Sequence, residues 1–157
     1  MSPHPKMNPT VRPFRADDVA PAASIIADTP LWRDRYAIDL QRAQGLLRAA
    51  LDRGDGLIAA ENAGTLAGFA WYVAKGAFAK SGYLRIIAVS PAQRGGGVGA
   101  ALLTAVESAV GGDLVILVSD FNDNAQRFYQ RHGYAEIGRL PGYVLPGVAE
   151  VILWKRR

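Results

Sequence analysis

The sequence predicts an α+β protein, a mixed three-layer sandwich in which helices cover a central sheet. Strand-like apolar segments dominate the middle of the chain, and helical stripes are inserted between some of them without a regular strand–helix alternation. The 157 residues suffice for one ordinary domain and are too few for two, and 50% of them are hydrophobic. We therefore expect a single domain over residues 11–157. Residues 1–10, which include three prolines, are expected to form a flexible tail.

The first expected elements are one short strand and two helices. Residues 11–14 fit a strand, and Asp17 or Asp18 fits the N-cap of a helix that ends before Thr29-Pro30. A second helix is predicted over residues 33–53, because apolar residues recur there at helical spacing. These residues are Tyr36, Leu40, Ala43, Leu47 and Leu51.

The middle of the chain is predicted to form strands. Residues 57–61 and 66–73 flank the segment Asn62-Ala63-Gly64-Thr65, which is a hairpin signal. Residues 83–89 are apolar except for one charge, Arg85, and fit a buried strand. A glycine-rich turn and a third helix are expected to follow this strand.

The last third of the chain alternates between strand and helix signals. Residues 114–118 form an unbroken apolar run typical of a buried strand. A short helix is predicted over residues 122–131 and is ended by Gly133. Residues 134–139 and 148–154 are expected to form a closing pair of strands.

Composition and charge argue against several kinds of site. The chain has no cysteine, and His4 and His132 lie far apart in the sequence, so we expect neither disulfides nor a bound metal. The net charge of +4 favours an anionic ligand, but no dense basic stripe interleaved with aromatic residues predicts nucleic-acid binding. No apolar run approaches the roughly 18 residues of a membrane span, and the first residues do not resemble a signal peptide. We expect a cytoplasmic protein with no membrane partner.

The glycine-rich turn is the most informative segment of the sequence. Four glycines occur among the five residues 95–99, after a strand and before a helix, with Arg94 at the edge of the turn. Such a turn lets several backbone N–H groups point at one anion, and the helix that follows adds partial positive charge. The dinucleotide fingerprint fails because Leu102 stands at its third glycine, and the lysine of a P-loop is missing. The turn fits the pattern (Gln/Arg)-x-x-Gly-x-Gly/Ala.

A second motif follows at residues 122–134, Asn122-Asp123-Asn124-Ala125-Gln126-Arg127-Phe128-Tyr129-Gln130-Arg131-His132-Gly133-Tyr134. With the segment Arg94-Gly95-Gly96-Gly97-Val98-Gly99-Ala100, it resembles the GCN5-related N-acetyltransferase (GNAT) family, in particular the RimI-like N-terminal acetyltransferase branch. The resemblance implies a twisted, mostly antiparallel sheet of about six or seven strands flanked by about four helices. It also implies acetyl-coenzyme A as co-substrate.

The resemblance assigns a role to each part of the two motifs. The turn would hold the coenzyme A pyrophosphate, the backbone of the preceding strand would bind the pantetheine arm and the acetyl carbonyl, and Asn122 would cap its helix and bind the arm. Tyr129 would be the general acid, because a phenol with a pKa near 10 stays protonated at pH 7 and can donate to the leaving thiolate. On spacing alone, Tyr129 fits ordinary helix packing equally well. The expected cofactor-binding residues are Ile87, Ala88, Val89, Arg94, Gly95, Gly96, Gly97, Val98, Gly99, Ala100, Asn122 and Tyr129.

The predicted reaction is direct transfer of an acetyl group to a primary amine in a ternary complex. Leu117 stands where ribosomal-protein N-terminal acetyltransferases carry a glutamate base, so Asp120 or a water molecule would have to replace that base. Deprotonating a lysine-type amine at pH 7 costs roughly 4.6 kcal/mol and an α-amine only about 1 kcal/mol, which favours a peptide or protein α-amine. The alternatives are a small-molecule amine such as a polyamine or amino sugar, and a non-catalytic acyl-coenzyme A sensor. A homodimer is implied by the resemblance only.

Four further residues have more than one interpretation. Arg85 fits a salt bridge within the sheet better than a place at the acceptor site. Strand alternation requires that one of Trp71 and Tyr72 points into the core, while the pair could also line the acceptor cleft. His132, next to the glycine that ends its helix, is interpreted as a surface or capping residue instead of a base.

Overall fold

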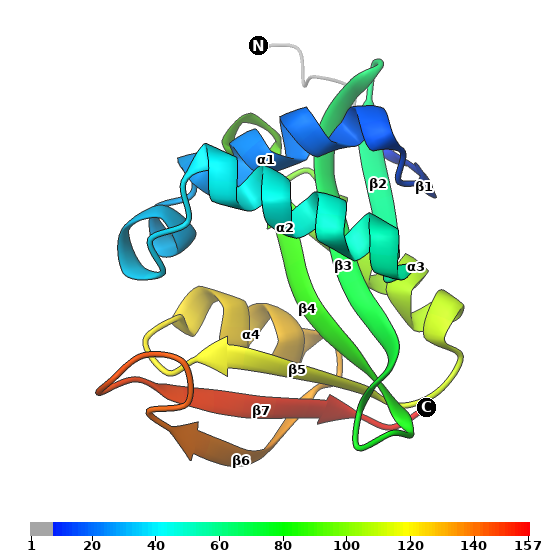
Figure 1. Cartoon of the computed structure of the whole chain (residues 1–157). Coiled ribbons are helices and arrows are strands. Elements are labelled where there is room, and N and C mark those ends of the chain that lie inside the picture. Colours follow the sequence, from blue (N-terminus) through cyan, green and yellow to red (C-terminus); the bar gives the residue numbers. More distant parts are fainter. Residues whose placement is uncertain (1–7) are drawn as a thin grey trace, which may run out of the picture. The chain divides into compact units, whose positions relative to one another are not determined.

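A computed structural model describes residues 8–157, and seven strands form one sheet in the order β1-β2-β3-β4-β5-β7-β6 (Figure 1). The strands are β1 (Thr10–Pro13), β2 (Gly56–Asn62), β3 (Thr65–Ala77), β4 (Ser81–Val89), β5 (Leu114–Ser119), β6 (Ala135–Pro141) and β7 (Ala149–Lys155). The helices are α1 (Val19–Asp28), α2 (Leu40–Arg53), α3 (Val98–Val110) and α4 (Asp123–Arg131). The pair β4–β5 is parallel, whereas β1–β2, β5–β7 and β6–β7 are antiparallel. The predicted α+β fold class is confirmed.

The second helix begins later than the sequence predicted. Residues Leu31–Arg35 form a separate π-helical turn, and Ala37 has a left-handed φ of 52°, so Tyr36 lies outside the helix. The side chain of Asp39 accepts a hydrogen bond from the backbone N–H of Arg42 at 2.8 Å and thereby caps α2. The predicted start at residue 33 is therefore wrong, because α2 begins at Leu40, about two helical turns later.

The strands β3 and β4 are longer than predicted because they continue into a hairpin. Their turn is made by Phe78 and Ala79, which both have left-handed φ values, of 56° and 55°. Residues with a β-carbon rarely adopt this conformation, so the sequence carries no turn signal there. The other predicted hairpin, at Ala63-Gly64, is present between β2 and β3.

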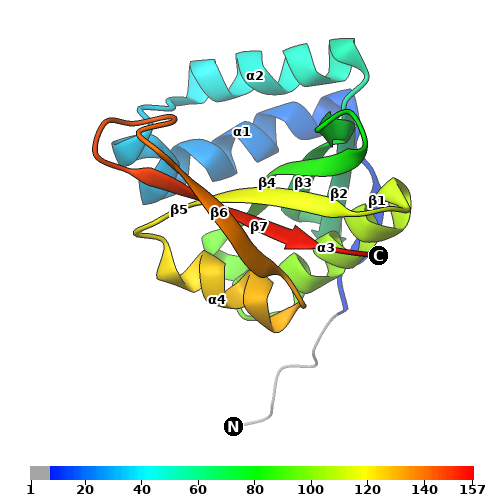
Figure 2. The same cartoon turned by 90° about the horizontal axis from the view of Figure 1, so that it is seen from below.

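The contacts of the described chain divide it into two compact units, and β3 and β4 each run from one unit into the other. The first unit comprises the described residues up to Trp71 together with Ile86–Ser108. In it, α1 and α2 lie side by side (Figures 1 and 2) and pack on the strands, with the Phe14 and Phe69 ring centroids 6.0 Å apart. Its core consists of Phe14, Val19, Ala22, Ala23, Ile25, Ile26, Ala43, Leu47, Ala50, Leu57, Ala59, Phe69, Trp71 and Ala88.

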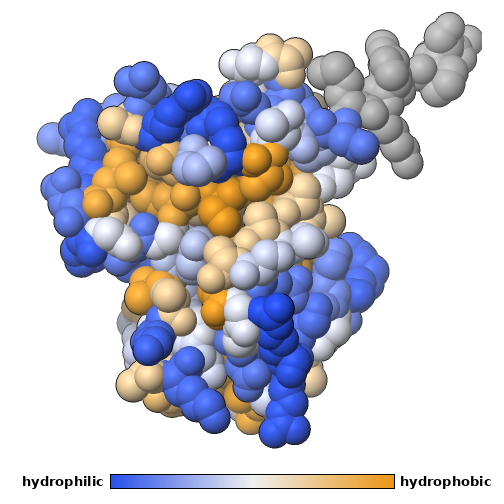
Figure 3. Space-filling model, turned by 90° about the vertical axis from the view of Figure 1, so that its right-hand side faces the viewer, coloured by the Kyte–Doolittle hydropathy of each residue, from blue (hydrophilic) through white to orange (hydrophobic). Residues whose placement is uncertain are grey.

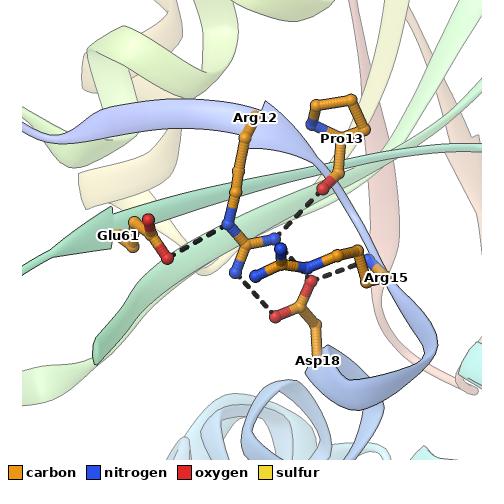
Figure 4. Close-up of polar contacts among 5 residues, drawn as sticks. All are labelled: Arg12, Pro13, Arg15, Asp18 and Glu61. Atoms are coloured by element: carbon orange, nitrogen blue, oxygen red, sulfur yellow. Dashed lines mark hydrogen bonds and ion pairs between the residues drawn. The ribbon is translucent and has the colours of Figure 1, made fainter. Parts of the chain in front are cut away.

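An ion-pair network joins the first strand of this unit to the start of α1 (Figure 4). Two guanidinium nitrogens of Arg12 donate to the two carboxylate oxygens of Asp18, at 2.8 and 2.9 Å. Asp18 also accepts from the backbone N–H of Arg15 at 2.7 Å, and Arg12 Nε donates to Glu61 on β2 at 3.0 Å. Asp18 is therefore a structural anchor, and its side chain accepts no helix-capping hydrogen bond at the start of α1.

The second unit comprises Tyr72–Arg85 and Ala109–Arg157. Its strands β5, β7 and β6 lie against α4 (Figure 2), which Asn122 caps by accepting from the N–H of Ala125 at 3.2 Å. Side chains at alternate positions of β7 point to opposite faces of the sheet. The Nζ of Lys155 lies 5.6 Å from the ring centroid of Tyr134, just after α4, so Val151, Leu153 and Lys155 face α4. Trp154, Ile152 and Glu150 face the other side.

The surface carries several large hydrophobic side chains, and on the face drawn in Figure 3 hydrophobic residues gather in a patch bordered by hydrophilic ones. Within the described residues, the exposed large hydrophobic side chains are those of Val11, Leu40, Phe78, Phe121, Ile137, Tyr143 and Val144. Within residues 8–157, none of the helices combines the length and apolar character that a membrane crossing requires.

Candidate active site

The glycine-rich turn lies in the first unit, between the end of β4 and the start of α3. A short 3₁₀ turn at Pro91–Gln93 leads into an extended Arg94, and Gly95 and Gly97 adopt left-handed φ values of 79° and 82°. Nothing lies within 4 Å of the position that a β-carbon would take at either glycine. The turn is therefore open on its side-chain face, and its backbone shape disfavours other residues.

The turn presents a run of backbone donors. Among residues 8–157, no partner is found for the N–H groups of residues 95–100, and the first helical bond of α3 runs from the N–H of Ala101 to the carbonyl of Gly97 at 3.0 Å. Arg94, which is exposed, stands at the beginning of this run. Free N–H groups at a helix N-terminus, together with the helix dipole, favour a bound anion such as a pyrophosphate.

A close approach between α3 and the sheet holds this turn in place. A β-carbon on Gly68 of β3 would lie 2.6 Å from the carbonyl oxygen of Ala88 and 3.1 Å from Val98. Only glycine fits between the strand that precedes the turn and the first residue of the helix that follows it. A hydrogen bond also connects the β2–β3 hairpin to the residues just before the turn, where Asn62 Nδ2 donates to Gln93 Oε1 at 2.9 Å.

The remaining residues of the predicted cofactor site lie on β4 and α4. Ile87, Ala88 and Val89 are the last residues of β4, which is anchored beyond its end by the bond from Ser90 N–H to the Ala67 carbonyl at 2.8 Å. They and residues 94–100 belong to the first unit, whereas Asn122 and Tyr129 lie at the start and on the body of α4 in the second.

Tyr129 is held inside an aromatic cluster of the second unit. Its side chain is buried, with its ring edge-on to Phe128 at 5.1 Å and to Tyr134 at 5.7 Å between centroids. Burial raises the pKa of Tyr129 well above that of an ordinary tyrosine, because the phenolate would lose its hydration. The phenol is therefore a permanent hydrogen-bond donor near neutral pH. That state suits a group that donates to a developing thiolate.

The structure gives structural roles to other polar candidates. Asp120 accepts a hydrogen bond from the backbone N–H of Ala149 at 3.0 Å, so its carboxylate joins the end of β5 to the start of β7. His132 ends α4 as its C-cap, with Nδ1 2.7 Å from the carbonyl oxygen of Phe128. Trp71 is fully buried and donates from Nε1 to Asp55 at 3.0 Å, so it is the core member of the pair with Tyr72.

Sequence reasoning missed one buried carboxylate. Glu150 on β7 is 5% exposed and lies opposite Ser119 of β5, on the same face of the sheet as Leu117. The signal in the sequence was a single acid inside an otherwise apolar strand, as with Arg85 on β4. In the described part of the chain, no group of three or more histidine, cysteine or acidic side chains is placed to hold a metal.

Comparison with known proteins identifies the family. The family model described as "Acetyltransferase (GNAT) family" matches residues 23–134, which is more than half of the chain. The chain therefore belongs to the GNAT acetyltransferase family. This confirms the predicted family and the predicted class of enzyme, an acetyl-coenzyme A-dependent acyltransferase. No curated protein matches the sequence.

Solved structures show the same fold at low sequence identity. A protein from Desulfovibrio desulfuricans, described as an acetyltransferase of the GNAT family, has a TM-score of 0.82 and 22% identity over 95% of this chain and 99% of its own. A ribosomal-protein-alanine N-acetyltransferase from Brucella melitensis has a TM-score of 0.77 and 20% identity, covering 94% of this chain and 99% of its own. The PaiA N-acetyltransferase from Thermoplasma acidophilum, solved with coenzyme A, has a TM-score of 0.74 and 15% identity, covering 96% of this chain and all of its own.

Proposed function

We propose that this chain transfers the acetyl group of acetyl-coenzyme A directly to a primary amine within a ternary complex. The observation that carries the proposal is the run of N–H groups at residues 95–100 without protein partners, at the N-terminus of α3 and beside Arg94. An isolated helix end contributes only about 0.3–2 kcal/mol for an anion, so several donors and a cation are needed for a pyrophosphate. This turn provides both.

The proposed roles of the other residues follow from their chemistry. The backbone of Ile87, Ala88 and Val89 aligns the thioester, and a backbone N–H polarises its carbonyl. Asn122 uses its carbonyl oxygen to cap α4. Its amide N–H groups are the donors that we assign to the pantetheine arm. Tyr129 donates a proton to the leaving thiolate, and because the chain has no cysteine, no cysteinyl-acyl intermediate is formed.

The acceptor class is proposed on energetic grounds. With Leu117 in place of a glutamate, an α-amine of a peptide or protein is favoured over a lysine side chain, because its deprotonation at pH 7 costs less. Polyamines and amino sugars are the competing acceptors. A cytoplasmic location and assembly into a homodimer remain predictions.

The test is acetyl transfer from acetyl-coenzyme A to a panel of peptides, polyamines and amino sugars, with products detected by mass spectrometry. Tyr129→Phe should lower kcat by about 100-fold or more while acetyl-coenzyme A still binds. The matched control is Tyr134→Phe, which removes a hydroxyl from the same aromatic cluster and should leave kcat nearly unchanged.

Two outcomes would count against this function. If acetyl-coenzyme A binds but no member of the panel is modified, the non-catalytic sensor becomes the better description. If acetyl-coenzyme A does not bind, the role assigned to residues 94–100 is wrong, and the proposed function is wrong with it.

A further inference from the structure

The β3–β4 hairpin of the second unit ends in a turn whose sequence does not suit its backbone. The N–H of Lys80 donates to the carbonyl of Ala77 at 3.2 Å, and the two residues between them, Phe78 and Ala79, have φ values of 56° and 55°. Positive φ at both central residues is the property of a type I′ turn, which favours Asn-Gly and Gly-Gly. Residues with a β-carbon adopt this conformation only at a cost in free energy. The stability of the hairpin therefore does not explain the residues found in its turn.

Phe78 is also the most exposed of the large hydrophobic side chains in the described chain. It is 79% exposed at the turn of the hairpin, whereas the neighbouring Ala77 is buried. A single exposed hydrophobic side chain is ordinary on a protein surface. Its position on a strained turn is not ordinary, because strain of this kind clusters at functional sites. We therefore expect Phe78 to contact a partner.

Two cationic side chains flank this turn on the hairpin itself. Residues 74–83 contain Lys75 and Lys80 and no acid. Residues paired across a hairpin, and those two positions apart on a strand, project from the same face. Because Ala77 is paired with Lys80, the side chains of Lys75 and Lys80 project from one face, on the two strands that lead into and out of the Phe78 turn. Both lysines are exposed.

The pairing of the strands brings two arginines to the same end of the sheet. Gly82 of β4 lies opposite Leu114 of β5, and Leu114 lies opposite Lys155 of β7. The residues that follow β7, Arg156 and Arg157, therefore leave the sheet at the end at which the β3–β4 hairpin turns (Figure 1). Both arginines are exposed.

An acid at this end of the sheet is already engaged by the chain. Asp113 accepts a hydrogen bond from the backbone N–H of Arg157 at 3.1 Å and another from Nε1 of Trp154 at 3.2 Å. The bond from Arg157 is the main cause that lowers the pKa of Asp113, and the charges of Arg156 and Lys80 lower it further. Lys80 and Arg156 therefore lie within electrostatic range of one carboxylate. Asp113 offsets one of the four exposed cations, so these side chains together carry a net positive charge.

We propose that this end of the second unit, called here the basic end (Lys75, Phe78, Lys80, Arg156 and Arg157), binds peripherally to the surface of an anionic lipid bilayer. The ring of Phe78 enters the boundary between headgroups and acyl chains, and the four cations stay at the level of the anionic headgroups. A bilayer accepts a projecting turn without a complementary pocket, and insertion of the ring offsets the strain of the turn. This inference goes beyond the proposed function and does not depend on it.

The proposal differs from the expectation drawn from the sequence, which was that the protein has no membrane partner. That expectation rested on the apolar runs, which are too short to span a bilayer, and peripheral binding needs no spanning segment. The two lysines and the two arginines of the basic end stand far apart in the sequence. They meet only when β5 pairs with both β4 and β7.

A nucleic acid shares the negative charge of such a bilayer but fits the basic end less well. Proteins that bind single strands stack successive bases on several aromatic side chains along a basic groove. The basic end offers the ring of Phe78, whereas the ring of Trp154 already has the guanidinium of Arg156 over it, 5.8 Å from the centroid. Contacts to a duplex backbone would use the cations and would give the Phe78 ring no apolar surroundings.

The first experiment measures co-sedimentation of the whole chain with vesicles of phosphatidylcholine alone and of an equimolar mixture of phosphatidylcholine and phosphatidylserine. We expect binding to the mixed vesicles that weakens as salt is added, because salt screens the attraction. The test variant combines Phe78→Asn with Ala79→Gly, which is the preferred sequence of a type I′ turn. It should bind mixed vesicles at least about tenfold more weakly, because the inserted ring is lost. It should also unfold at a higher urea concentration than the wild type, because the turn is no longer strained.

The matched control for the ring is Tyr143→Asn. Tyr143 is an aromatic residue that is 65% exposed and lies in the loop before β7, at the opposite end of that strand from the basic end. This substitution should leave vesicle binding unchanged within about twofold. A loss of binding that follows only from the removal of an exposed aromatic side chain would appear in both variants.

A second comparison tests the cations at equal net charge. Lys80→Glu should weaken binding to the mixed vesicles at least about tenfold, because an attraction is replaced by a repulsion at the headgroups. Arg48→Glu, at an exposed position of α2 in the first unit, changes the net charge by the same amount and should weaken binding no more than about twofold. Circular dichroism reports whether each variant is folded.

Each result supports or overturns the proposal. Wild-type binding that is absent, or equal on the two kinds of vesicle, overturns it, and so does a Phe78→Asn/Ala79→Gly variant that binds as the wild type does or is less stable. Equal losses in Lys80→Glu and Arg48→Glu would report net charge alone and would also overturn it. Tighter binding to a single-stranded oligouridylate, with the same dependence on Phe78 and Lys80, would assign the basic end to nucleic acid instead. Acetyl transfer in solution is measured without vesicles, so the proposed function stands or fails separately.

Discussion

Replacing Asp18 by asparagine tests the ion-pair network that anchors α1 to β1. The Asp18 carboxylate is buried and accepts three hydrogen bonds of 2.7–2.9 Å, two of them from the Arg12 guanidinium. Removing one partner of a buried pair typically costs about 3–5 kcal/mol. Because Arg12 keeps Glu61 and the asparagine oxygen still accepts one bond, we expect a loss of about 3 kcal/mol in the free energy of unfolding at pH 7.

The same pair gives this loss a defined pH dependence. The Arg12 guanidinium holds the pKa of Asp18 below its ordinary value, chiefly through the side-chain hydrogen bonds. A carboxyl with a lowered pKa in the folded state stabilises the protein above its unfolded pKa of about 3.9, and this contribution disappears as pH falls through the lower folded value. The difference between wild type and Asp18→Asn should therefore be constant between pH 7 and about pH 5 and shrink below about pH 4.

Urea denaturation at pH 7, 5 and 3.5 measures this difference, and Asp17→Asn is the control. Asp17 is the neighbouring acid, is exposed, and has no hydrogen bond to its side chain within the described residues. The Asp17→Asn substitution should therefore change the free energy of unfolding by no more than about 0.5 kcal/mol. Equal stabilities of the two variants at pH 7, or a loss in Asp18→Asn that persists undiminished at pH 3.5, would refute the assignment of this network as an anchor.

Two further predictions concern the supports of the candidate site. Gly68→Ala places a β-carbon 2.6 Å from the Ala88 carbonyl, so it should destabilise the protein by about 1–3 kcal/mol and weaken acetyl-coenzyme A binding measured by calorimetry. Gly45→Ala, in a helix with no neighbour within 4 Å, should instead stabilise it by about 0.5–1 kcal/mol. Asn122→Ala removes the cap of α4 and should cost about 1 kcal/mol in urea denaturation. Asn124→Ala, on the exposed side of the same helix, should be nearly neutral, and similar losses in both would contradict the capping role.

Elements whose boundaries depend on neighbouring residues were predicted correctly from the sequence. Boundaries that depend on tertiary packing were not. Asn122 and Gly133 mark the two ends of α4 as expected, because a cap and a left-handed residue follow from chemistry within a few positions. The start of α2 was misplaced because Tyr36 continues the apolar spacing by coincidence. Asp39, three residues before Arg42, was the cap signal that could have corrected it.

The candidate site likewise has parts that local sequence predicts and parts that depend on packing or strand pairing. The turn at residues 95–100 was predictable because glycine spacing reports directly on open backbone donors. Glu150 was not singled out, because its place beside Leu117 arises only when β7 pairs with β5, a register that neither strand specifies alone. The close approach at Gly68 was likewise invisible, since one glycine in a strand does not reveal what lies across from it.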